Sequence, residues 1–464
     1  MGTLKKNFAF AFGAQGLQLI QSVLWSLLIP KLMGVEQFGY WQLFIFYTQY
    51  GGFLSFGMID GTYLEIGGQE YKKLNYSFLG YQLRMFVLWQ LLILLPVAIY
   101  GMNHATAERS FTIITSCIYV ILANVMGYLM YVLQAVNEIK YMSFGRMLTT
   151  ICFLSSIVVL LFLRIDIFEP YVICYMICNS VCMVYYITKT KEILAYTFSL
   201  KTSDGYLSHL IKDIKVGSVL LLSNICGMLV LGFGRFMVDE EWGIKAFSVV
   251  SFSFMFVNFF MTFVQQGSLV LFPELRRWDE ERIRRFYVKF RRVMSLVFPT
   301  VLLLYLPIYY LVELWLPQYL ESAKYLLFLL PLCIFDTKMN LLCNTLFKVL
   351  NHVKSLLLCN VLALAFSALG ILISIFVIKS MIAVVSCMLL SIILRSVVAE
   401  VMLSKMFVTA SVWKNLGMEL FMVALFIFSN IWTGINIAFI IYAIATLVRF
   451  VLNKTELKMM IERK

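Results

Sequence analysis

Long apolar stretches separated by short polar segments run along the whole chain. Each stretch has about the length that an α-helix needs to cross a bilayer, roughly 20 residues. The stretches 147–163 and 355–378 hold no charged residue, and they are too long for buried strands. The pattern therefore predicts an all-α polytopic membrane protein with about fourteen transmembrane helices. The expected spans are 8–30, 41–62, 78–100, 111–134, 144–163, 170–188, 213–235, 243–266, 293–313, 323–347, 355–378, 380–404, 416–432 and 436–453.

The distribution of Lys and Arg orients these helices. With the N-terminus in the cytoplasm, the cytoplasmic segments hold 27 of the 38 Lys and Arg residues, and the outer segments hold seven. Short cytoplasmic loops collect positive charge, and one helix more or fewer would invert every later loop. We therefore expect both termini in the cytoplasm.

Composition agrees with a chain that is almost entirely membrane-embedded. Hydrophobic residues make up 61% of it, charged residues 14%, and the mean hydropathy is +0.87. The net charge of +13 comes from cations beside the spans, so nucleic acid is not an expected partner. The densest basic segment, 275–293, carries an apolar stripe of Leu275, Trp278, Phe286 and Phe290. This segment is typical of an interfacial helix on anionic lipid, with docking of a partner protein as the alternative.

Two pairs of similar short segments divide the chain into similar halves. Residues 31–40 match residues 235–244 in the order of a cation, Met, Glu, an aromatic residue and Gly, and residues 136–140 match 350–354 around an Asn and a Lys. Six predicted helices separate the members of each pair, which predicts a parallel repeat about an axis along the membrane normal. The expected organisation is an N-lobe over 1–205, a C-lobe over 206–405, and two further helices with a cytoplasmic tail over 406–464. Each lobe then has six helices.

The segment 32–40 (Leu-Met-Gly-Val-Glu-Gln-Phe-Gly-Tyr), the Leu-Ser-Phe-Gly of 54–57 before Gly61, and the segment 314–323 carry a family resemblance. The chain resembles the polysaccharide transporter branch of the multidrug/oligosaccharidyl-lipid/polysaccharide exporter superfamily, although Leu316 stands where that branch often has Gly. The resemblance implies a flippase in the bacterial cytoplasmic membrane. It would move an isoprenoid-diphosphate-linked oligosaccharide to the outer leaflet by alternating access, for O-antigen or capsule synthesis, with polysaccharide-assembly proteins as candidate partners.

A sugar diphosphate crosses hydrocarbon only where its charge is compensated, and charged residues inside spans are rare. Arg84, Lys338 and Arg395 are therefore expected to line a cationic central cavity. Their alternative role is a structural ion pair, with Asp336 as the expected partner of Lys338. Arg449 is expected to snorkel to the interface. Polar neighbours extend the expected path, although interhelical hydrogen bonds are their alternative role. The candidate substrate-binding residues are Arg84, Lys338, Arg395, Asp336, Gln15, Gln18, Gln49 and Asn344.

Other functions make different demands on the sequence. A drug exporter of the same superfamily usually needs an embedded carboxylate, and we expect a peptidoglycan-precursor flippase to carry cations in its first helix. Neither kind of residue occurs between Lys6 and Lys31. A polysaccharide polymerase would need a large outer loop, and none is predicted, so we expect no enzyme. The histidines His104, His209 and His352 fall in separate predicted loops, and we expect no metal and no cofactor.

Overall fold

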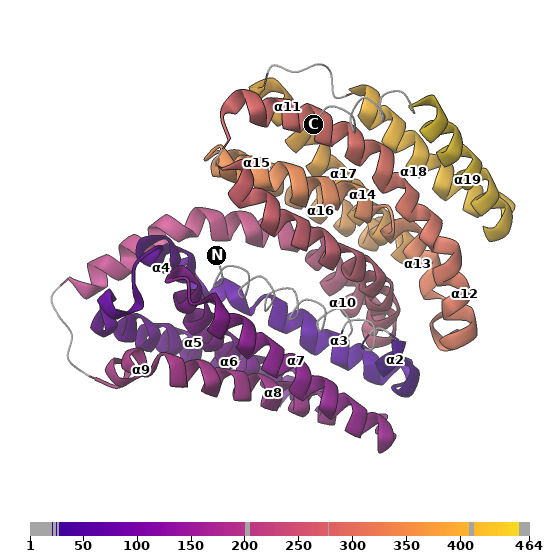
Figure 1. Cartoon of the computed structure of the whole chain (residues 1–464). Helices are drawn as coiled ribbons and strands as arrows, with labels where there is room; N and C mark the ends of the chain where they lie inside the picture. The colour runs from indigo at the N-terminus through magenta and orange to yellow at the C-terminus, as the bar shows by residue number, and fades with distance from the viewer. Residues whose placement is uncertain are drawn as a thin grey trace. The chain divides into compact units, whose positions relative to one another are not determined.

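The computed structural model describes residues 27–199, 205–276, 278–407 and 413–453, together with Gln21 and Trp25. Every regular element within these ranges is a helix (Figure 1). Eleven of the helical segments are long and apolar enough to cross a membrane. The prediction of an all-α, multi-pass membrane protein is therefore confirmed.

The chain forms two compact units, Met1–Ile225 and Cys226–Lys464. The helices of the first unit are mostly long, and the 3₁₀ turns η1 (Gly51–Ser55) and η2 (Tyr71–Lys73) lie between them. They are α2 (Ile29–Leu32), α3 (Val35–Gln49), α4 (Met58–Ile66), α5 (Tyr76–His104), α6 (Ala107–Ala135), α7 (Ile139–Phe162), α8 (Glu169–Lys189), α9 (Lys191–Thr197) and the beginning of α10 (Tyr206–Leu275).

The predicted span 41–62 is wrong in detail, because the helix is broken inside it. Helix α3 ends at Gln49, the η1 turn follows, and α4 starts at Met58. Phe56 and Gly57 between them have positive φ values of 48° and 88°. Glycine adopts such a conformation at little cost. Hydropathy alone did not reveal the break, because the turn residues are themselves mostly apolar.

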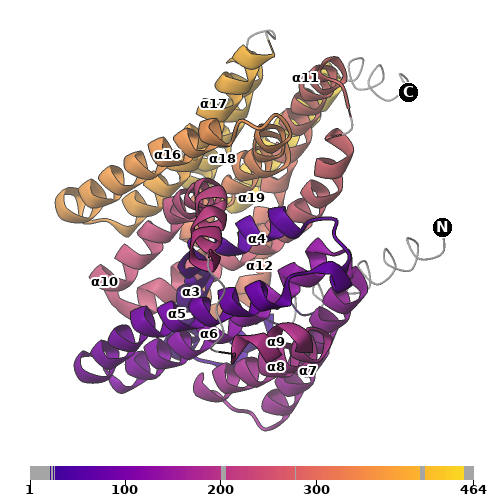
Figure 2. The same cartoon turned by 90° about the vertical axis from the view of Figure 1, so that its left-hand side faces the viewer.

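Unit 1 is built around α5 and α6, which pack along one another (Figures 1 and 2). Helix α9 lies against α5, and α7 runs along α8. The buried core between α4, α5 and α6 includes Phe78, Phe86, Tyr128 and Leu129. At the end of this core the hydroxyl of Tyr71 donates to Glu192 Oε2 at 3.0 Å, tying η2 to α9. Burial, and then the Glu192 carboxylate, raise the pKa of Tyr71, so its hydroxyl keeps its proton.

Unit 2 contains the rest of α10 and a series of helices with several short or wide turns. They are α11 (Glu280–Val297), η3 (Phe298–Leu304), α12 (Tyr305–Trp315), η4 (Pro317–Tyr319), α13 (Ser322–Leu329), α14 (Leu332–Lys338), the π-helical η5 (Met339–Asn344), α15 (Thr345–Val349), α16 (Val353–Ile373), the π-helical η6 (Ser374–Ile378), α17 (Met381–Met406), α18 (Trp413–Thr433) and α19 (Ile435–Leu452). Helix α17 packs against α13, α14 and α16, and α18 packs against α19. Helix α17 is thus central to the unit.

Helix α10 belongs to both units and holds the predicted spans 213–235 and 243–266. Its backbone is interrupted at Gly243, where φ is 77° and ψ is −177°, close to the predicted break between these spans. The division between the two compact units falls after Ile225, inside α10. The predicted lobe boundaries at residues 205 and 405 stay predictions. The internal repeat and the cytoplasmic placement of both termini stay predictions.

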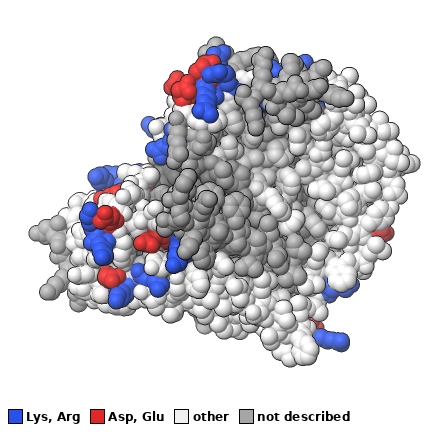
Figure 3. Space-filling view, viewed as in Figure 1, with Lys and Arg blue, Asp and Glu red and all other residues white. Residues whose placement is uncertain are grey.

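The surface is apolar along the helices and charged near their ends. Figure 3 shows wide white faces, with Lys, Arg, Asp and Glu gathered around α4 and α9 in unit 1 and around α11 in unit 2. The exposed apolar side chains include Leu92, Phe376 and Val377, which are 76%, 66% and 75% exposed. Such exposure is costly in water and normal for helices that face lipid.

Candidate functional site

A chain of polar side chains crosses the interior of unit 2. Arg395 of α17 donates through Nε to Asn360 Oδ1 of α16 at 2.7 Å, and its Nη1 lies 3.4 Å from Asp336 Oδ1 of α14. Asp336 Oδ2 in turn accepts from Asn340 Nδ2 at 3.2 Å. Asn340 Oδ1 accepts from Asn344 Nδ2 at 3.0 Å. Three residues from the predicted path, Arg395, Asp336 and Asn344, are therefore linked in one hydrogen-bonded chain.

The backbone around this polar chain is adapted to it. Helix α14 passes directly into the π-helical turn η5, which carries both Asn340 and Asn344. Such wide turns recur at functional sites, because they change the direction in which successive side chains point. On α10, a Cβ added to Gly227 would lie 2.9 Å from Arg395 Nη2. Glycine at this position therefore leaves room for the guanidinium group.

Lys338 is enclosed in a separate ion cluster. Its side chain is 0% exposed, its Nζ pairs with Glu400 of α17, and the same atom lies 2.7 Å from Glu419 Oε2 of α18. The expectation that Asp336 would pair with Lys338 is wrong, because Asp336 pairs with Arg395. Lys338 ties three helices together, and its predicted contact with substrate stays a prediction.

Two further buried arginines stand close to these carboxylates. Arg291 of α11, 3% exposed, donates to the Tyr287 hydroxyl at 3.3 Å and interacts electrostatically with Glu400. Arg449 of α19, 5% exposed, donates to Ser295 Oγ at 3.0 Å and interacts with Glu419. The prediction that Arg449 snorkels to the interface is therefore wrong.

The remaining predicted residues lie in unit 1 or outside the described part of the chain. Arg84 of α5 is half-buried, donates to the Ser199 carbonyl oxygen, and stands over the Tyr81 ring at 5.5 Å. Gln49, the last residue of α3, is exposed. Gln15 and Gln18 lie outside the described residues. Arg84 and Gln49 are thus in a different unit from the polar chain of Arg395.

The sequence analysis missed a second buried polar group, in unit 1. Asn124 of α6 donates to Gln90 Oε1 of α5 at 2.7 Å and to the Gly51 carbonyl oxygen at 2.9 Å. Two turns earlier on α5, Gln82 donates to Asp213 Oδ2 of α10 at 2.5 Å. The available signal was the spacing of Gln82 and Gln90, which places both on one face of a helix.

Comparison with known proteins shows the fold. No family model matches the sequence, and no curated protein does. A lipid II flippase MurJ in an inward closed conformation is similar over 97% of this chain and 99% of that one, with a TM-score of 0.69 and 12% identity. An inward-facing multidrug resistance MATE family transporter of the MOP superfamily is similar over 86% of this chain and 96% of that one, with a TM-score of 0.61 and 13% identity.

A third solved structure, a point mutant of the Vibrio cholerae MATE transporter VcmN, is similar over 88% of this chain and 98% of that one. Its TM-score is 0.51 and its identity to this chain is 14%. The likeness extends over nearly the full length of all three proteins, which are a flippase and two transporters. The chain therefore has the same fold as these three proteins.

Proposed function

We propose that the protein is a flippase for an isoprenoid-diphosphate-linked oligosaccharide. It carries this lipid from the inner to the outer leaflet of the bacterial cytoplasmic membrane, for the synthesis of a surface polysaccharide. The fold likeness to a lipid II flippase over 97% of the chain supports a lipid-linked substrate. The motifs of 32–40 and 54–57 support an oligosaccharide head in place of a peptidoglycan precursor.

The observation that carries this proposal is the buried polar chain of Arg395. A diphosphate inside the membrane requires cationic donors, and arginine presents several N–H groups to phosphate in a fixed fork. Asn360 holds the guanidinium group through Nε, whereas the contact with Asp336 is long at 3.4 Å. Phosphate oxygens would replace this loose contact when the substrate is bound. Asn340 and Asn344 supply amide groups for the sugar hydroxyls next to it.

The other two predicted cations receive different roles. Lys338 is enclosed by two carboxylates and stabilises the helices around the path. Arg84 is half-buried, and its donation to a backbone carbonyl leaves it available as an entry contact for the headgroup in unit 1. Phe286 stacks on Phe290 within α11 and meets the ring of Trp278, just before α11, edge-on; these three aromatic residues are proposed to rest on anionic lipid.

A drug exporter is the second candidate, because two of the similar structures described above are MATE transporters, one of them a multidrug resistance transporter. Its support in this chain is a set of carboxylates in unit 2, the buried Glu400 and Glu419 and the half-buried Asp336, of the kind that couple transport to a cation. Each of them, however, has a cationic side chain as a neighbour. An embedded carboxylate that is already compensated binds a further cation poorly.

Reconstitution distinguishes these functions. The purified chain is placed in vesicles with a polyprenyl-diphosphate oligosaccharide carrying a fluorophore on its sugar, and a membrane-impermeant quencher reports the leaflet. Parallel vesicles contain a peptidoglycan-precursor lipid or the cationic dye ethidium. We expect rapid flipping of the oligosaccharide lipid alone. Transport of ethidium without flipping would replace the proposal with drug export, and flipping of the precursor alone would reassign the substrate.

Variants then test the path. Arg395→Ala should slow flipping at least tenfold, because it removes both the charge and the fork of donors. Arg395→Lys should give an intermediate rate, since it keeps the charge but not the fork. Lys354→Ala, which removes an exposed cation of the same unit, is the matched control and should leave the rate unchanged. Normal flipping by Arg395→Ala would refute the assigned path.

A further inference from the structure

The backbones of α4 and α10 touch through glycines in unit 1. A Cβ added to Gly61 would lie 2.1 Å from the Asp213 carbonyl oxygen, and one added to Gly217 would lie 2.0 Å from the Gly57 carbonyl oxygen. Gly57 and Gly61 are four residues apart, the small-residue spacing that brings membrane helices into close contact. Gly57 lies against Gly217, and Gly61, four residues later, lies against Asp213, four residues earlier on α10. The two helices are therefore antiparallel here.

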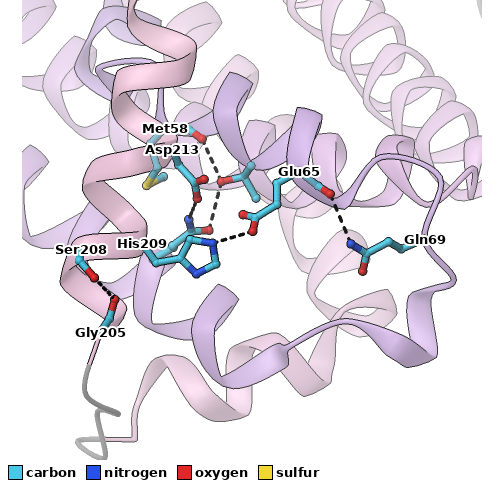
Figure 4. Close-up of polar contacts among 9 residues, drawn as sticks. Met58, Glu65, Gln69, Gly205, Ser208, His209 and Asp213 are labelled. Carbon is cyan, nitrogen blue, oxygen red and sulfur yellow. Dashed lines mark hydrogen bonds and ion pairs between the residues drawn. The ribbon is translucent and has the colours of Figure 1, made fainter.

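One turn beyond Gly61, the same register brings Glu65 of α4 opposite His209 of α10. Asp213 follows His209 by four residues and shares its helix face. Figure 4 shows the three side chains turned toward one another, with His209 Nε2 at 2.6 Å from Glu65 Oε1. One ligand atom from each of Glu65, His209 and Asp213 lies within 4.8 Å of the others. His209 is therefore helical and not in a loop as expected from the sequence, since α10 begins at Tyr206.

Neighbouring side chains orient two of the three groups. Asp213, 3% exposed, accepts from Gln82 at 2.5 Å. The Gln82 oxygen accepts from the hydroxyls of Thr62 and Tyr128, each at 3.1 Å. The Phe78 ring stacks on the His209 ring, with centroids 4.2 Å apart and planes inclined by 13°. A carboxylate held in this way, and an imidazole fixed by stacking, form a preorganised ligand set, and such outer contacts strongly affect metal affinity.

Charge and exposure also favour a cation. The cluster holds two carboxylates and one imidazole, so its net charge is negative when both carboxylates are ionised. Asp213 is buried, whereas the side chains of His209 and Glu65 are 38% and 35% exposed. An ion therefore has access from the surface and meets a fixed carboxylate inside.

We propose that Glu65, His209 and Asp213 bind one divalent transition-metal ion of the Zn²⁺ type. An imidazole with two carboxylates is a ligand set that Zn²⁺ accepts, with water in its open position. Mg²⁺ and Ca²⁺ prefer oxygen ligands alone and usually more of them. Ligands about 2.1 Å from the metal in a tetrahedron lie about 3.4 Å apart, so the 2.6 Å contact between His209 and Glu65 must open by less than 1 Å.

A bound ion would join α4 to the first turns of α10, next to their glycine contact. Helix α10 continues past Ile225 into the second unit. The ion would therefore regulate any transport step in which these turns leave α4. This site is independent of the identity of the substrate.

Metal titration of the full-length chain tests the proposal. The protein is purified in detergent, treated with chelator, and titrated with ZnCl₂ while the bound ion and the thermal unfolding temperature are measured. We expect one Zn²⁺ per chain and a higher unfolding temperature, and no rise with the same concentration of MgCl₂. The Co²⁺ form should show the visible bands of nitrogen and oxygen ligands without thiolate charge-transfer absorption. Absence of binding, or thiolate bands that reveal cysteine ligands, would overturn the site.

Substitutions locate the ion. His209→Ala and Glu65→Gln should each weaken Zn²⁺ binding at least tenfold, and both side chains are exposed enough for the chain to fold without them. The matched controls are His104→Ala and His352→Ala, because these are the other two histidines of the chain. Both should bind as the parent does. Unchanged affinity in His209→Ala would show that the 2.6 Å contact is only an ion pair between His209 and Glu65.

Discussion

Replacement of Lys338 by methionine isolates the charge at the centre of unit 2. Methionine keeps a long unbranched side chain and removes the ammonium group. It leaves Glu400 and Glu419, 1% and 0% exposed, without the cation between them. At an effective dielectric constant of about 20, attraction across the 2.7 Å contact with Glu419 is worth about 6 kcal/mol before desolvation is subtracted. Removal of one partner of a buried ion pair typically costs about 3–5 kcal/mol.

We therefore expect Lys338→Met to lower the free energy of unfolding by about 3–5 kcal/mol. The nearby guanidinium groups of Arg291 and Arg449 keep the loss from being larger, because they still compensate part of the carboxylate charge. The unfolding temperature should fall by about 3–5 °C, because a chain of 464 residues unfolds with an entropy of about 1 kcal/mol/K. The assay is thermal unfolding of the detergent-solubilised chain. Lys354→Met, at an exposed position, is the control and should change the free energy by less than about 0.5 kcal/mol.

A triple variant separates charge from packing. Lys338→Met combined with Glu400→Gln and Glu419→Gln removes all three charges and keeps the shapes. Its stability should lie between those of the single variant and the parent, because no carboxylate is left uncompensated, whereas Arg291 and Arg449 lose the charges of Glu400 and Glu419. A single variant as stable as the control would refute the charge argument. A triple variant as unstable as the single one would assign the loss to packing.

The same triple variant decides whether Lys338 meets the substrate. If the lysine acts through structure, the triple variant should flip the labelled lipid at a rate close to that of the parent. If Lys338 binds the diphosphate, the triple variant should fold normally and fail to transport. Stability and transport measured on one preparation therefore distinguish the structural role from the predicted contact.

Three further predictions concern topology, packing and driving force. Reporter fusions after Lys201 and Lys464 should both read cytoplasmic, and an external signal from either would refute the fourteen-helix topology. Gly61→Ala should destabilise the chain by about 1–3 kcal/mol in thermal unfolding, because its Cβ would meet the Asp213 carbonyl oxygen. The control Gly52→Ala has open space around its Cβ and should leave the stability unchanged. Equal stability of the two variants would contradict the close contact. A membrane potential, negative on the substrate side, should accelerate flipping, since two exported charges gain about 4–5 kcal/mol at 100 mV; strict dependence on a sodium or proton gradient would refute this.

The helices were predictable because their signal is local. An apolar run of membrane length gives the same helix whatever surrounds it, so α5, α6 and α16 lie close to their expected limits. The break between α3 and α4 was not predictable in this way. There the backbone turns through residues that are mostly apolar, and only the clustering of Gly51, Gly52 and Gly57 hinted at it.

The site was only partly predictable, because ion pairing depends on which helices face one another. The sequence did single out Arg395, Asp336 and Asn344, because they are charged or polar residues inside predicted spans. It also suggested Asp336 as the partner of Lys338, and this suggestion did not consider where the two side chains point on a helix. Residues two apart on a helix point about 200° away from each other. The true partner Glu419 lies 81 residues later, and no local pattern specifies that contact.

The buried charges of unit 2 and the partly exposed cluster of unit 1 differ in net sign, and this difference argues for different ligands. In unit 2, Lys338, Arg395, Arg291 and Arg449 accompany three carboxylates, so the described cluster carries a surplus of positive charge. In unit 1, two carboxylates share one imidazole. An anion entering unit 2 is attracted and a sodium ion there is repelled, whereas the unit 1 cluster attracts a cation. Buried charges interact more strongly than charges in water. The sign of the net charge in each unit is therefore a better guide to its ligand than the number of acidic residues. Three embedded carboxylates therefore do not by themselves make this chain a cation-coupled exporter.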